Sequence, residues 1–236
     1  MPAKHTIKEF VRDSVYHLYN RGVEKQPIFR DAQDFGVFLS YLKDYLVPKD
    51  EAGLQQILTN PESPWREKDR ALKLLRLNNF SDTIDLLCYC LMPNHFHLLV
   101  KQAEATTIDR FMNSLCTRYT MYFNKKYKRV GPLFQSVYKA VLVQTDAQLF
   151  YLTRYIHRNP LGNGRYKTLA SQGIALRSWN YGSYPEYLGK RQTGWVKPQE
   201  ILQNFSTSGF TSYVSFVDGK DTEESSVEEI AQLMID

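Results

Sequence analysis

Residues 85–101 read DLLCYCLMPNHFHLLVK, and this stretch decides the fold that we expect. Two runs of mostly apolar residues, 85–92 and 95–101, flank the short segment Met92-Pro93-Asn94. Apolar runs of this length that meet at a turn containing proline and asparagine are typical of two antiparallel strands. The stretch therefore predicts a hairpin within a sheet.

The segments around this hairpin alternate between strand and helix patterns. Further strands are predicted at 15–19 and 136–144, and helices at 31–46, 107–126 and 146–159. Thr107 and Asp146 are the expected N-caps of the last two helices. The order predicts an α+β fold: a ferredoxin-like antiparallel sheet (βαββαβ) with one added C-terminal helix. Because its helices would pack on one face, we expect the other face to be partly open.

The chain is expected to divide into three parts. Residues 1–164 would form the sheet domain, and within them 48–84 is an inserted helical excursion. Residues 165–217 predict a small extension rich in aromatic side chains. Residues 218–236 hold seven acidic residues against the single Lys220, a net charge of −6, and predict an acidic tail.

Composition excludes several classes of protein. The 236 residues are 43% hydrophobic and 23% charged, which is ordinary for a globular protein. The longest apolar run, 86–92, is far shorter than the roughly 20 residues that a membrane helix needs. Three cysteines make no disulfide framework and suit a reducing compartment. We therefore expect a cytoplasmic protein without a signal peptide or a membrane span.

Positive charge is concentrated in one segment. The formal net charge is +5, and residues 118–139 contain six basic residues and no acidic one, interleaved with six Tyr and Phe. Cations for phosphates and rings for bases are typical of a surface that binds single-stranded nucleic acid. The same pattern also fits a solvated basic helix whose aromatic side chains cover a core. Charge alone leaves both interpretations open.

Two further patterns carry chemistry. His95 and His97 lie two apart on a predicted strand, so their side chains share one face, as half of a metal site or as hydrogen-bonded histidines. Tyr155 and Asn159 lie four apart on the last helix and share a face, whereas His157 points away. Alternatively, Tyr155 packs on the sheet and Asn159 only caps the helix.

Together these blocks resemble the HUH single-tyrosine transposases, and most closely the REP-associated tyrosine transposases. The similar blocks are LMPNHFHLLVKQ (91–102), RYTMYFNKKYKRVGPLFQSVYKA (118–140) and YIHRNPL (155–161). The resemblance extends over about residues 15–164, and WNYGSYPEYLG (179–189) with GWV (194–196) is similar to the branch's C-terminal extension. Insertion-sequence members typically have Gln four residues after the tyrosine, whereas Asn159 is what the REP-associated branch commonly has.

The resemblance implies an enzyme, a metal-dependent endonuclease and strand transferase acting on single-stranded DNA. Tyr155 would be the nucleophile that forms a 5′-phosphotyrosine intermediate at sites beside a DNA hairpin. His95, His97 and Asn159 would bind the divalent metal, Mg²⁺ or Mn²⁺. The protein would partner single-stranded or hairpin DNA and no membrane, and the monomer and the homodimer both stay open.

The expected DNA contacts fall in the basic segment. Gln135 and Lys139 lie where the family places DNA-contacting groups, and the helix cations would bind backbone phosphates collectively. The extension is expected to add DNA contacts. The full set of side chains comprises Arg118, Lys125, Lys126, Lys128, Arg129, Gln135 and Lys139.

Two other functions fit the same residues. A domesticated relative would bind a DNA hairpin without cutting it. A non-enzymatic nucleic-acid-binding module would use Cys88, Cys90, His95 and His97 to hold a structural zinc ion. His17, on the first predicted strand, is expected to be a structural or edge residue near the site.

Overall fold

A computed structural model describes residues 10–162, 169–209 and 211–219. Most of the predicted acidic tail, 220–236, lies outside these described residues. Across the part of the chain that is described, none of the helices is long and apolar enough to cross a membrane.

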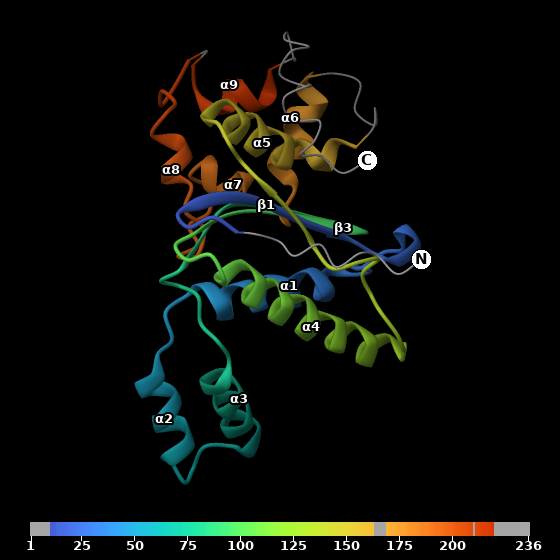
Figure 1. The fold of residues 1–236 in the computed structure, drawn as a ribbon, viewed down its shortest axis with the longest axis vertical. Helices are drawn as coiled ribbons and strands as arrows, with labels where there is room; N and C mark the ends of the chain where they lie inside the picture. Colours follow the sequence, from blue (N-terminus) through green and yellow to red (C-terminus); the bar gives the residue numbers. More distant parts are fainter. Residues whose placement is uncertain (1–9, 163–168, 210, 220–236) are drawn as a thin grey trace.

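A four-stranded antiparallel sheet forms the middle layer (Figure 1). Its strands lie side by side in the order β2-β3-β1-β4, which confirms the predicted α+β class and the ferredoxin-like strand arrangement. The predicted hairpin is confirmed, and β4 is shorter than expected because it pairs only with the β1 residues 16–19. The strands are β1 (Ser14–Arg21), β2 (Ile84–Met92), β3 (His95–Gln102) and β4 (Lys139–Leu142).

Helices α1 (Ala32–Leu46) and α4 (Thr107–Tyr127) cover one face of the sheet (Figure 1). Both present apolar side chains at helical spacing to a core that includes Phe38 and Phe111, together with Leu98 of β3. Asp31 caps α1 by accepting a hydrogen bond from the backbone N–H of Asp34.

The opposite face of the sheet is also covered, so the expectation of a partly open face was wrong. Helix α5 (Asp146–Arg158) lies over it with the short C-terminal helices (Figure 1). A second core joins Leu87, Cys88 and Leu99 to Ile156 of α5 and Tyr213 of α9. The remaining elements are η1 (Val23–Lys25), η2 (Asn159–Leu161), α6 (Leu169–Ser178), α7 (Tyr184–Tyr187), α8 (Gln199–Leu202) and α9 (Tyr213–Asp218).

Two expected N-caps were wrong by one residue. Thr145 caps α5 by accepting from the backbone N–H of Gln148, so Asp146 is already the first helical residue. Thr106 precedes α4, where Thr107 is the first helical residue and is buried. Residues 48–84 do contain helices, α2 (Glu51–Thr59) and α3 (Trp65–Arg76), which pair with each other at a distance from the sheet (Figure 1). The division into domains stays a prediction.

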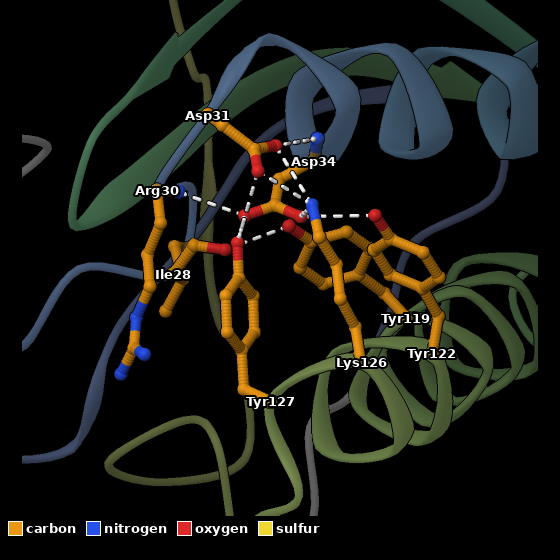
Figure 2. Close-up of polar contacts among 8 residues, drawn as sticks. All are labelled: Ile28, Arg30, Asp31, Asp34, Tyr119, Tyr122, Lys126 and Tyr127. Atoms are coloured by element: carbon orange, nitrogen blue, oxygen red, sulfur yellow. Dashed lines mark hydrogen bonds and ion pairs between the residues drawn. The ribbon is translucent and has the colours of Figure 1, made fainter.

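A buried carboxylate joins α1 to α4 (Figure 2). The Asp34 side chain is fully buried, and Lys126 Nζ lies 2.7 Å from its Oδ1. The hydroxyls of Tyr122 and Tyr127 also donate to this carboxylate, at 2.9 and 2.8 Å. Burial acts to raise the pKa of Asp34, but the hydrogen bonds from Lys126, from the Arg30 backbone and from the two tyrosines leave it below its ordinary value.

We expect Asp34→Leu to lower the free energy of unfolding by about 3 kcal/mol, because it leaves Lys126 and two hydroxyls without their buried acceptor. A carboxyl whose pKa is lowered by folding contributes stability above its unfolded pKa of about 3.9. This contribution disappears as the pH falls through the folded value. Urea unfolding between pH 3 and 7 measures both effects. Asp31→Asn, which keeps a good N-cap, should cost much less, and an equal loss in both variants would contradict the burial argument.

Candidate active site

The predicted histidine pair lies on the sheet face beneath α5. Strand alternation places His95 and His97 on this face and Phe96 in the opposite core. On the neighbouring strand β1, Arg21 pairs with His95 and Tyr19 with His97 in the antiparallel register. Directly paired residues share a face, so the two strands together present imidazoles, a phenol and a guanidinium to α5.

Helix α5 brings the predicted tyrosine and asparagine to these histidines. The amide Oδ1 of Asn159 lies 2.9 Å from His95 Nε2, and its Nδ2 lies 3.2 Å from His97 Nε2. The Tyr155 ring is half-buried, and its centroid lies 5.4 Å from that of the His97 ring. The histidines on β3 and the residues at the end of α5 lie about 60 positions apart in the sequence. The fold thus brings them together in one small volume.

The environment keeps both imidazoles neutral. Burial lowers the pKa of His95, and the nearby charge of Arg21 lowers it further, although the hydrogen bond to Asn159 acts in the opposite direction. Burial also holds the pKa of His97 well below its usual value, helped by His17, His95 and Arg21. Neutral imidazole is the form that binds metal ions.

The donor set fits a divalent cation. The Nδ1 atom of His97 lies 2.8 Å from His17 Nε2, and Nδ1 of His95 lies 2.7 Å from Asn94 Oδ1. On each ring, Nδ1 therefore contacts a side chain on the side away from Asn159, here called its outer partner, and Nε2 faces the Asn159 amide. Neighbouring ligands of an octahedral ion with bonds of about 2.1 Å are about 3 Å apart, which matches the contact between Asn159 Oδ1 and His95 Nε2. The contact to His97 Nε2 comes from the amide Nδ2, which donates a hydrogen bond in this structure.

The alternative zinc site does not form. Cys88 and Cys90 are fully buried, and burial raises the pKa of both thiols and so disfavours the thiolate that zinc binds. Among residues 10–162, 169–209 and 211–219, no group of three or more His, Cys, Asp or Glu side chains could hold a metal ion. A site at the histidine pair thus depends on the Asn159 amide as a ligand.

Residues next to Tyr155 and Asn159 on α5 pack against the C-terminal extension. His157 points away from the site, as predicted, and its ring nitrogens lie 2.8 Å from Tyr213 Oη and 2.9 Å from Ser183 Oγ. Burial lowers the pKa of His157 to about 3. Arg154 and Arg158 donate to the backbone carbonyls of Phe216 and Val217 near the end of α9. Carbonyls at a helix C-terminus lack helical partners, so these cations serve them well.

The predicted DNA-contacting side chains separate into two groups. Helix α4, with three of the six cations, lies on the face of the sheet opposite to α5 (Figure 1). There Arg118 pairs with Asp44 at 2.8 Å, and Lys126 is held by Asp31 and Asp34. Lys139 is exposed and pairs with Tyr19 on the strand face that carries the histidines, with Nζ 5.6 Å from the Tyr19 ring centroid. The others are exposed or half-exposed: Lys125, Lys128, Arg129 and Gln135.

Sequence reasoning expected His17 near the site but not its contact with His97, and it missed Asn94 and Arg21. His17 is fully buried and contacts His97, Asn94 contacts His95, and Arg21 faces His95 across the strands. The alternation of His17, Tyr19 and Arg21 along β1 does place them on one face. Only the register between β1 and β3 shows which histidine each of them meets.

Comparisons with known proteins give one family match and several similar solved structures. Residues 65–159 match the family described as transposase, IS200-like, so the match spans both histidines and ends at Asn159. No curated protein matches the chain. Among solved structures, a REP-associated tyrosine transposase bound to a REP hairpin is similar at 8% identity and a TM-score of 0.42, over 80% of this chain and 94% of that one. A putative transposase from Deinococcus radiodurans is similar at 18% identity and a TM-score of 0.28, over 63% and 92%. The family match covers residues 65–159, 95 of the 236 residues, and this segment is similar to the IS200-like transposases.

Proposed function

We propose that this protein is a metal-dependent endonuclease and strand transferase for single-stranded DNA, with Tyr155 as its nucleophile. The observation that supports this most is the convergence of Tyr155, His95, His97 and Asn159 on one face of the sheet. The finer proposal, cleavage beside a DNA hairpin as in the REP-associated branch, rests on the sequence resemblance.

The chemistry is a transesterification. The Tyr155 oxygen loses its proton and forms a bond to the scissile phosphorus, while the bond from phosphorus to the 3′-oxygen breaks. That oxygen takes up a proton and leaves as a 3′-hydroxyl, and the 5′-phosphate stays on the tyrosine. A divalent ion held by His95, His97 and Asn159 would withdraw charge from the phosphate oxygens. A phenol with an ordinary pKa of about 10 needs such help at neutral pH.

Strand transfer follows from the same intermediate. The phosphotyrosine bond is a phosphodiester, so it conserves the energy of the bond that was broken. A 3′-hydroxyl from another strand can attack the phosphorus, release Tyr155 and join the two DNA ends. The reaction therefore needs no nucleoside triphosphate.

The DNA path is proposed along the α5 side of the sheet. Arg21 and Lys139 lie on the strand face that carries the histidines, where they can bind phosphates next to the scissile one. The exposed Gln135 and Lys128 belong to the segment that leads into β4. Arg118 and Lys126, in contrast, are already paired with carboxylates, so we assign them little of the DNA affinity.

We expect Lys139→Gln to weaken binding of single-stranded DNA and to reduce the slope of log affinity against log salt by about 0.7, the value for one lost phosphate contact. Fluorescence anisotropy at several salt concentrations measures both quantities. Lys73→Gln is the matched control, because this exposed lysine lies on α3, away from the sheet. Equal losses in the two variants would argue against a DNA path along β4.

The decisive experiment uses labelled single-stranded DNA from the flanks of the protein's own gene, with Mn²⁺ or Mg²⁺. A covalent protein–DNA adduct that survives denaturation supports the proposal. Hairpin binding without any adduct, under all metal conditions, would instead favour a domesticated hairpin-binding protein.

A further inference from the structure

We propose that the loop after β1 is a positioning device for the metal site, which acts through Asn94 to fix the proton of His95 on Nδ1. This inference rests on the proposed function, in which the Nε2 atom of His95 binds the metal ion. It concerns residues 22–26 and Asn94. None of them contacts Asn159 or Tyr155 in the contacts described above.

Three contacts in series carry the argument. The side-chain Nδ2 of Asn94 donates to the backbone carbonyl of Lys25 at 3.2 Å. This bond fixes the direction of the amide, so that Oδ1 is the atom that meets His95 Nδ1 at 2.7 Å. An amide oxygen can only accept, so a proton in this contact belongs to the imidazole. Of the two amide oxygens that His95 faces, Asn94 Oδ1 is the nearer, at 2.7 Å against 2.9 Å for Asn159 Oδ1, and we assign the single N–H to that side.

The consequence appears at the other nitrogen. A neutral imidazole has one N–H, so with the proton on Nδ1, the Nε2 atom carries a lone pair. This lone pair faces Asn159 Oδ1 at 2.9 Å, and two lone pairs at that distance repel each other. A cation that both atoms bind removes the repulsion. The Lys25–Asn94–His95 series thus sets His95 as a metal ligand before any metal arrives.

The backbone of the loop is held in an unusual conformation to reach Asn94. Glu24 and Lys25 have φ values of 54° and 60°, in the left-handed region that residues with a Cβ seldom adopt. Gly22 donates its backbone N–H to the carbonyl of Asn94 at 2.8 Å. A Cβ atom on Gly22 would lie 2.1 Å from the carbonyl oxygen of Gln26, so only glycine fits. Strain that the surrounding contacts hold in place is common near functional sites.

The second histidine has a different partner, which comes from β1. His97 meets His17 of β1 through its Nδ1, at 2.8 Å. Strand β1 therefore supplies the partner of His97, and the loop that follows β1 holds Asn94, the partner of His95. His17 and the loop residues 22–26 precede the segment 65–159 that matches the IS200-like family, whereas Asn94 lies within it.

Mn²⁺ binding by the DNA-free protein tests this, with free Mn²⁺ measured by electron paramagnetic resonance. We expect Asn94→Leu to weaken Mn²⁺ binding by about 10–100-fold, the usual cost of removing an outer partner of a ligand. Asn94→Asp, which keeps an acceptor for Nδ1–H, should stay within a few-fold of the wild type. Gly22→Ala should weaken binding as Asn94→Leu does, whereas Lys25→Gly, which keeps the carbonyl and suits a positive φ, should not.

A second measurement on the wild type decides the matter even if a variant fails to fold. Nitrogen NMR of the metal-free protein should show His95 in the Nδ1–H form. The Nε2–H form there, or unchanged Mn²⁺ binding in Asn94→Leu, would overturn the inference. If the wild type binds Mn²⁺ and forms the DNA adduct, and Asn94→Leu binds Mn²⁺ equally well, only this inference is refuted. If the wild type neither binds Mn²⁺ nor forms the adduct, the proposed function is refuted together with this inference.

Discussion

Tyr155→Phe should abolish the covalent protein–DNA adduct and leave hairpin binding within about twofold of the wild type. The substitution removes a single oxygen, and with it the only atom that we assign to the attack on phosphorus. The ring itself stays, so its edge contact with the His97 ring, at a centroid distance of 5.4 Å, is preserved. Denaturing gels with end-labelled DNA measure the adduct, and anisotropy in EDTA measures binding.

Tyr151→Phe is the matched control for this experiment. Tyr151 lies one turn earlier on α5, and its ring packs at 5.6 Å from that of Phe216 in the extension instead of at the histidines. We expect this variant to form the adduct at close to the wild-type rate. An adduct that persists in Tyr155→Phe, or disappears in Tyr151→Phe, would show that the nucleophile is misassigned.

The sequence predicted the sheet because each of its signals was local. The hairpin at 85–101 needed only two apolar runs and a Pro-Asn turn, and the structure has β2 and β3 within one residue of the expected bounds. The alternation that separates His95 and His97 from Phe96 is equally local. The cap of α5 was missed because Thr145 and Asp146 are adjacent and both can cap a helix.

Contacts between distant segments could not be predicted in the same way. Nothing in the stretch 118–139 shows that Asp34, on another helix, is fully buried against Lys126, and this pairing changes how the positive charge is used. In the same way, the packing of the C-terminal extension on α5 depends on contacts of His157 with Ser183 and Tyr213, which are 26 and 56 residues away. A single sequence shows which residues are polar, but not which of them pair.

Asn159→Ala should raise the Mn²⁺ concentration needed for half-maximal adduct formation by about 100-fold or more. The Asn159 amide lies within 3.2 Å of both imidazole Nε2 atoms, so its removal takes away a shared direct ligand. The loss of an outer partner of a metal ligand already weakens metal binding by about 10–100-fold. Adduct yield across a Mn²⁺ titration at fixed DNA concentration measures the effect.

Asn159→Asp separates loss of a ligand from damage to the helix end. Aspartate has the same shape and offers an oxygen that binds divalent ions well, so this variant should need no more Mn²⁺ than the wild type. Both substitutions leave in place the backbone bond from Asn159 N–H to the carbonyl of Ile156. If Asn159 mattered only as a helix cap, the two variants would share their metal dependence and differ only in thermal stability. A 100-fold gap between them at equal stability can arise only where the side-chain oxygen meets the metal.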